Sequence, residues 1–154
     1  SMTRDDVIRS THSHIQTVGV FLSQFCNNLI NRIIWHDASK FSPEEWPAFE
    51  KATPLLADLT YGSEEYKAAL ASIKPALDHH YRMNCHHPEY HPNGIKDMNL
   101  LDVVEMLCDW FAATKRHKDG DLKSSIIKNA QRFGYGEEMT NLLLNTAKYL
   151  SWID

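Results

Sequence analysis

Apolar residues recur at helical spacing along almost the whole chain, and this periodicity constrains the fold more than any other feature. In residues 5–25, for example, apolar side chains fall three, four and seven positions apart, as on one face of an α-helix. The alternation of apolar and polar residues that marks a half-buried strand is absent. The sequence therefore predicts an all-α fold, a compact bundle of six or seven helices. A chain of 154 residues is long enough for a full core, so residues 1–154 are interpreted as a single helical domain.

The predicted helix boundaries follow from caps, prolines and glycines. Helices are expected over residues 5–25, 29–35, 43–52, 63–84, 99–117, 122–133 and 137–152. Pro75 should interrupt the fourth of these, because proline lacks an amide hydrogen and clashes with the preceding turn. Ser42 and Asn99 are the expected N-caps of their helices, and Ser63-Glu64-Glu65 opens the fourth. Residues 85–98 form a long connection, and long connections in compact domains are often functional.

The break in the pattern at Asn27 and Asn28 decides where His14 lies. In one unbroken helix, His14 and His36 would be about 33 Å apart, at about 1.5 Å per residue. A hairpin at the two asparagines would instead bring the histidines level, and asparagine tolerates turn conformations. The sequence alone favours neither arrangement over the other.

Composition narrows the class of protein. The net charge of -4 gives no reason to expect a stable nucleic-acid partner. No apolar run approaches the roughly 20 residues of a membrane span and no signal peptide opens the chain, so no membrane partner is expected. The three cysteines, Cys26, Cys85 and Cys108, lack the spacing of a disulfide framework. Free thiols in a reducing, cytoplasmic compartment are therefore expected.

Histidine is the outlying feature of the composition, with nine in the chain and five of them between His79 and His91. The pair His36-Asp37 falls at a predicted corner between a helix and a loop, where neighbouring side chains can converge on one ion. Mixed imidazole and carboxylate ligands suit Mn, Fe, Co, Ni or Zn better than Ca. The candidate ligands are His14, His36, Asp37, His79, His80, His86, His87, His91, Asp102, Glu105 and Asp109.

Three acids in the predicted helix 99–117 have two interpretations. Asp102, Glu105 and Asp109 lie on one side of this helix, opposite its apolar residues. That side could be solvated, which the periodicity alone favours, or it could line a metal cleft. His86 and His87 likewise fit metal ligands, substrate contacts or residues of a polar loop.

The order of these residues resembles the HD superfamily of metal-dependent phosphohydrolases. The matching residues are His14, then His36-Asp37 followed by Lys40, then His79-His80, then Asp109. Two segments, His79-His80-Tyr81-Arg82 and the residues from Leu100 to Asp109, are similar to the HD-GYP branch. The GYP signature itself is absent, and Asn84 replaces an acid of that branch. The resemblance implies an HD-like bundle in which His14, His36, Asp37, His79, His80 and Asp109 hold one or two divalent transition-metal ions.

The same resemblance implies hydrolysis of a phosphoester in a nucleotide or another small phosphorylated molecule. Asp37, His80 and Lys40 would be the catalytic residues. Arg82, His86 and His87 would contact the substrate. Two alternatives remain open: a di-iron oxygenase on the same fold, and a binding or inhibitor protein that uses the fold as a scaffold. Many HD-like proteins self-associate, which leaves a homo-oligomer open.

Nearly the whole chain also resembles a family of short bacterial and phage proteins of unknown function. The segments that carry this resemblance are HDxSKFSxxE, HHYxxNxHHPE and MxLxDxxEMLCDWxAA. This second resemblance implies no particular activity.

Overall fold

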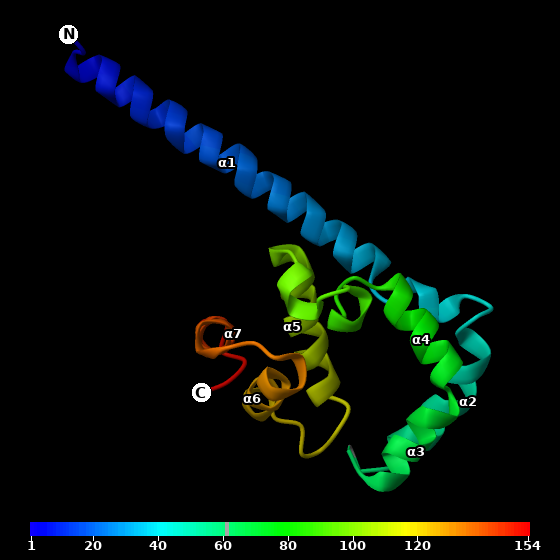
Figure 1. Ribbon diagram of the computed structural model, residues 1–154. Helices are drawn as coiled ribbons and strands as arrows, with labels where there is room; N and C mark the ends of the chain where they lie inside the picture. Colours follow the sequence, from blue (N-terminus) through cyan, green and yellow to red (C-terminus); the bar gives the residue numbers. More distant parts are fainter. Residues whose placement is uncertain (61) are drawn as a thin grey trace. The chain divides into compact units, whose positions relative to one another are not determined.

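The computed structural model describes residues 1–60 and 62–154, and all regular secondary structure in these ranges is helical (Figure 1). This confirms the predicted all-α fold with seven α-helices. The helices are α1 (Arg4–Trp35), α2 (Trp46–Ala57), α3 (Glu64–Ser72), α4 (Lys74–Met83), α5 (Leu100–Thr114), α6 (Leu122–Phe133) and α7 (Glu137–Tyr149). Short 3-10 helices, η1 (Ala38–Phe41), η2 (Pro88–Tyr90) and η3 (Gly94–Asp97), lie in the connections.

The chain divides into two compact units, residues 1–36 and residues 37–154, called here the first and second unit. The first unit consists of α1, and the second contains every element from η1 to α7. The interpretation of residues 1–154 as one HD-like domain stays a prediction. Within residues 1–60 and 62–154, no helix is both long and apolar enough to cross a membrane.

Helix α1 runs unbroken for 32 residues, so the hairpin considered at Asn27 and Asn28 is wrong. Thr3 and Asp6 form a capping box at its start. The Asn28 side chain donates a hydrogen bond to the carbonyl oxygen of Gln24, 2.9 Å away, one turn earlier. The side-chain amide is thereby satisfied along the helix and does not cap a turn.

Helix α2 begins and ends later than the predicted range 43–52. It spans Trp46–Ala57, with Pro47 in its first turn and Pro54 inside it. Proline fits the first turn because the amide there has no partner within the helix. Ser42, the expected cap, instead ends η1 and accepts hydrogen bonds from the next turn through its carbonyl oxygen.

The other helix ends agree more closely with their sequence signals. Pro75 has the predicted effect, since α3 ends before it and α4 begins with the proline in its first turn. Ser63 caps α3, and Asn99 caps α5 in a capping box with Asp102. Helices α5 and α7 end three residues earlier than predicted, and α6 matches its predicted range.

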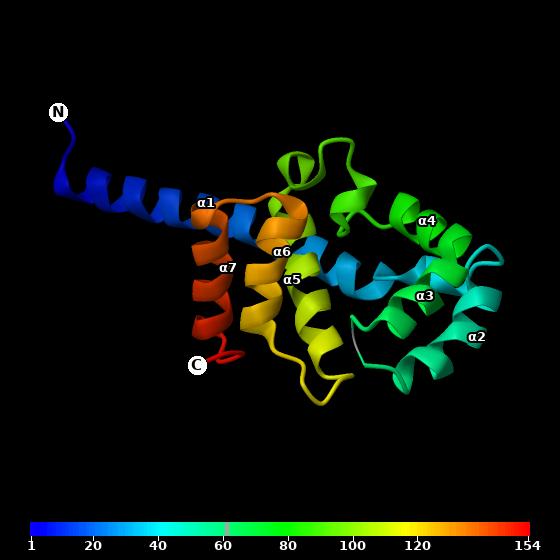
Figure 2. The ribbon, with the colours of Figure 1, turned by 60° about the horizontal axis from the view of Figure 1, so that its bottom comes forward.

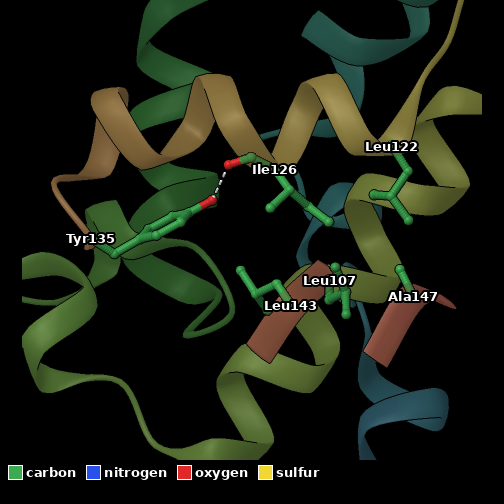
Figure 3. Close-up of a cluster of buried hydrophobic side chains, with 6 residues drawn as sticks. All are labelled: Leu107, Leu122, Ile126, Tyr135, Leu143 and Ala147. Atoms are coloured by element: carbon green, nitrogen blue, oxygen red, sulfur yellow. Dashed lines mark hydrogen bonds between the residues drawn. The ribbon is translucent and has the colours of Figure 1, made fainter. Parts of the chain in front are cut away.

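The hydrophobic core of the second unit lies among α5, α6 and α7, which Figure 2 shows next to one another. Figure 3 shows the buried side chains from these helices pointing toward one another, with the Tyr135 hydroxyl donating a hydrogen bond to the carbonyl oxygen of Ile126. The buried residues are Leu107, Leu122, Ile126, Tyr135, Leu143 and Ala147. This packing fixes one face of α5 and thereby positions the opposite, acidic face.

Candidate metal centre

The acidic face of α5 is directed into the second unit. Asp102 is buried, and the side chains of Glu105 and Asp109 are 10% and 29% exposed. Glu105 and Asp109 both contact His86, and Asp102 lies 3.5 Å from the Nε2 atom of His91. The interpretation of this face as solvated is therefore wrong, because carboxylates on a solvated face would not be covered by imidazoles.

Glu45 is fully buried and holds two histidines, one with each carboxylate oxygen. Its Oε2 lies 2.7 Å from His79 Nδ1, and its Oε1 lies 2.7 Å from His80 Nδ1. Burial raises the pKa of Glu45, but hydrogen bonds from Ser39, His79 and His80 outweigh burial and lower it. A neutral imidazole that donates its Nδ1 hydrogen to a carboxylate presents the Nε2 lone pair on its other side. Glu45 therefore orients His80 as a ligand.

His86 has the same arrangement with a carboxylate from α5. Its Nδ1 lies 2.9 Å from Glu105 Oε2, while its Nε2 lies 3.4 Å from Asp37 Oδ1 and 3.6 Å from Asp109 Oδ2. Burial lowers the pKa of His86, but hydrogen bonds with Asp109 and Glu105 outweigh burial and raise it to about 9. Asp37 and Asp109 thus favour positive charge on the side to which the Nε2 atom points.

Four ligand atoms converge at this point of the second unit. His80 Nε2 lies 3.0 Å from His87 Nε2 and 3.3 Å from Asp37 Oδ1. One ligand atom each from Asp37, His80, His86 and His87 lies within 4.8 Å of all the others. Ligands at about 2.1 Å from one transition-metal ion are about 3 Å apart, by simple polyhedral geometry. The observed separations therefore match the edges of a coordination polyhedron.

His87 completes the set as a neutral imidazole. Burial, together with the charges of His86 and His80, lowers its pKa to about 3. A neutral ring keeps a lone pair available for a metal ion. His87 also lines a cavity beside the cluster, so it connects the four ligands to open space.

Asp37 reaches the cluster from an unusual backbone conformation. Its φ of 52° and ψ of 20° lie in the left-handed region, which few residues other than glycine adopt. Strained conformations of this kind cluster at functional sites. Asp37 Oδ2 forms an ion pair with Lys40 Nζ at 3.0 Å, while Oδ1 faces His80 and His86. The two oxygens thus have separate partners.

The predicted pairing of His14 with His36 around one ion is wrong within a single chain. Both residues belong to the first unit, where the unbroken α1 separates them by about 33 Å. His14 is exposed, and His36 is the C-cap residue of α1. His36 directly precedes Asp37 in the chain, and its role as a ligand stays a prediction.

Three further predicted residues have other surroundings. The Nδ1 atom of His79 contacts Glu45, so this histidine helps to hold the carboxylate that orients His80. The described contacts of His91 lie outside the four-ligand cluster. Its Nε2 atom lies 2.8 Å from the Cys85 carbonyl oxygen. Arg82 is exposed on α4, and its contact with substrate stays a prediction.

Sequence reasoning missed Glu45 as a functional residue. It lies in the turn before α2, where no helical periodicity can indicate which way a side chain points. The available signal was its place as the last residue of the segment HDxSKFSxxE, eight positions after Asp37. An acid at a fixed distance from a His-Asp pair is the kind of residue that supports a ligand.

A cavity of about 920 Å³ reaches the cluster through His87 and Asp109. This volume lies within the range of small-molecule sites, about 300–1,000 Å³. Among the described residues, its wall includes three aromatic side chains, four cations and four further acids: Tyr81, Trp110, Phe133, Arg116, Lys118, Lys128, Arg132, Asp58, Glu89, Asp119 and Asp121. A ligand with both a ring and anionic groups would find partners here.

A family model described as a family of unknown function, DUF5662, matches residues 3–152, a range that includes every residue of the cluster. Comparison with curated proteins and with solved structures gave no match.

Proposed function

We propose that this chain, which belongs to the DUF5662 family, is a metal-dependent phosphohydrolase that acts on a nucleotide or another small phosphoester. The observation that carries the proposal is the convergence of Asp37, His80, His86 and His87 on one point. Carboxylates stand behind two of the imidazoles, as they do behind histidines that bind transition metals. The phosphoester substrate is supported by the resemblance to the HD superfamily.

The ligand set favours a transition metal. Three imidazoles and one carboxylate suit Mn, Fe, Co, Ni or Zn, whereas Ca and Mg prefer ligands made only of oxygen. The four converging atoms would form the coordination sphere of one ion. Asp109, 3.6 Å from His86 Nε2, offers a further carboxylate for this ion or for a second one. When bound, such an ion lowers the pKa of a coordinated water and polarises a phosphoryl oxygen.

The chain's own residues would supply charge and proton transfer around the phosphate. Lys40 is held beside Asp37 at 3.0 Å and keeps a side chain that is 34% exposed, so its ammonium can also reach an anionic substrate. Asp109 lies both at the cluster and on the cavity wall, where its carboxylate can accept a proton from an attacking water. His87 belongs both to the cluster and to the cavity wall.

The cavity supports a substrate that carries a ring as well as a phosphate. Trp110 and Phe133 stack with ring centroids 6.2 Å apart and present an aromatic wall. Lys128 and Arg132 on α6 add positive charge to the same wall, although Arg132 already lies 3.5 Å from Glu89. Nucleotides combine these two features, and arginine and lysine are common phosphate partners.

The test starts with elemental analysis of protein purified without chelator. Bound Mn, Fe, Co, Ni or Zn is expected, followed by hydrolysis in a panel of nucleotides and phosphoesters supplied with Mn²⁺, Co²⁺, Ni²⁺ or Mg²⁺. Asp37→Asn should lower metal affinity by more than about 100-fold, because changes behind the ligands already cost about 10–100-fold. Asp154→Asn, at the exposed C-terminus, is the matched control.

Two other results would redirect the proposal. Bound iron with a turnover that consumes oxygen would identify the di-iron oxygenase alternative. A protein that binds none of these metals, and whose properties do not change in Asp37→Asn, would instead be a binding or inhibitor protein.

A further inference from the structure

The first unit is a single helix and so cannot bury its own apolar side chains. No residue of α1 is buried, although the helix carries many large apolar residues, including Ile8, Ile15, Phe21, Leu22 and Phe25. Contiguous apolar surface of this extent marks an interaction site in proteins. These apolar residues of α1, called here the stripe, therefore need a partner surface from outside the first unit.

The apolar residues of α1 follow a seven-residue repeat. Ile8, Ile15, Leu22 and Leu29 recur every seven positions. Val18 and Phe25 fall three positions after members of that series, in the second apolar position of the repeat. The opposite side is mainly polar and includes Ser13, Gln16, Thr17, Ser23, Gln24 and Asn31. The first position is apolar in all four repeats and the second in the two central ones, a pattern that favours a short coiled-coil contact centred on residues 15–25.

We propose that α1 pairs with α1 of a second copy of this chain in an antiparallel two-stranded coiled coil. In this register Ile15 packs against the partner's Phe25, and Val18 packs against the partner's Leu22. A twofold axis relates the two copies, so each of these two residue pairs occurs twice. One face of α1 is therefore complementary to the same face of its copy. The inference is independent of the proposed enzymatic function.

Charge favours the antiparallel orientation over the parallel one. Arg4 and Arg32 occupy the second apolar position of the repeat, so a parallel pair would place each arginine against its own copy. In the antiparallel pair Arg32 lies opposite the partner's Ile8, next to the partner's Asp5. The helix dipoles also oppose each other favourably in this orientation.

Size favours a second copy over coverage of α1 by the second unit alone. A helix of 32 residues is about 48 Å long. A compact unit of the length of residues 37–154 is only about 35 Å across. With the seven large apolar side chains named above burying about 100 Å² each, the pair would bury roughly 700 Å² per copy, near the usual 800 Å² of a stable interface.

The first experiment measures the mass of the full chain by light scattering during gel filtration, over a dilution series. The wild-type protein should have about twice the monomer mass of 17.8 kDa. Leu22→Lys, in the stripe, should shift the mass to that of the monomer. Val20→Lys, also exposed and apolar but on the opposite side of α1, should leave the dimer intact. A monomeric wild-type protein would overturn the proposal.

The second experiment tests the pairing without destabilising it, by disulfide cross-linking in a Cys26→Ser, Cys108→Ser background. Phe21 lies beside the twofold axis of the antiparallel pair, so Phe21→Cys should form a cross-linked dimer on mild oxidation. Phe25→Cys should not, because it faces position 15 of the partner. Efficient cross-linking by Phe25→Cys alone would indicate a parallel pair and overturn the orientation. No cross-link at either position would overturn the coiled coil itself.

Discussion

The second unit contains two buried regions of opposite chemistry, the metal-centre cluster and the hydrophobic core, and α5 contributes to both. Leu107 faces the core and is 4% exposed, while Glu105 faces the cluster with a side chain that is 10% exposed. The core is held by apolar burial, which depends on volume and has little directional preference. The cluster is held by directional contacts among charged and polar groups.

This difference predicts which property a substitution in each region should change. Removing a core side chain leaves a cavity and lowers the free energy of unfolding. Replacing a charged partner in the cluster by its neutral isostere leaves no cavity, but it removes one side of a buried pair and so also destabilises the fold. Unlike a change in the core, it should in addition lower the affinity for an ion. The two regions can therefore be separated by measuring stability and metal affinity on the same variants.

The largest expected effect on stability is that of Ile126→Ala. Ile126 is fully buried in the core, so the change should lower the free energy of unfolding by about 2–5 kcal/mol. Chemical denaturation followed by circular dichroism would measure this, and metal affinity should stay unchanged. Ile127→Ala is the matched control, because its side chain is 49% exposed. Equal losses in the two variants would show that α6 does not face the core as described.

An intermediate effect is expected from Glu105→Gln. The amide cannot hold His86 Nδ1 as a charged acceptor does, so metal affinity should fall about 10–100-fold, or about 1.4–2.7 kcal/mol. Competition with a chromophoric chelator would measure the affinity. Glu44→Gln, an exposed neighbour of Glu45, should have no effect. If the free energy of unfolding fell by more than the free energy of metal binding, Glu105 would mainly stabilise the fold and would not support a ligand.

The smallest effect is expected from Tyr135→Phe, which removes the hydrogen bond to the Ile126 carbonyl oxygen and should cost about 1 kcal/mol near neutral pH. Burial raises the pKa of Tyr135 to about 12 from a usual 10.0. The unfolded chain therefore ionises first, and stability present below pH 10 is lost as pH rises toward 12. Denaturation curves over this range should show the wild-type protein losing its advantage over the variant.

Tyr149→Phe serves as the control for that measurement, because Tyr149 is 89% exposed. Its stability should follow the wild-type curve at every pH. If Tyr135→Phe also followed the wild-type curve, burial of the Tyr135 hydroxyl would not couple folding to ionisation.

Local signals predicted the fold because helices, prolines and caps are properties of short segments. Pro75 and Asn99 act where the sequence indicated, and Asp37, His80 and the two histidines before Pro88 do converge. The long connection of residues 85–98 supplies two of those ligands, as its length suggested. Convergence itself depends on tertiary packing, so the sequence could name candidate ligands without excluding His91.

The errors have physical causes of the same kind. Asparagine is tolerated in helices as well as turns, so Asn27 and Asn28 could not show whether α1 continues. Only the resemblance to the HD superfamily places His14 beside His36, and no local signal opposes that placement. Glu45, by contrast, is a functional residue that was missed. A residue in a turn has no periodic pattern by which its burial could be recognised.

The left-handed backbone at Asp37 limits how this centre could be re-engineered. Glycine adopts that conformation freely and asparagine and aspartate do so occasionally, whereas branched side chains do so only with greater strain. A new ligand of different softness, such as cysteine for a thiophilic ion, would enter more easily at His87, whose backbone is extended. The choice of metal could thus be altered from the side of the histidines while the aspartate stays in place.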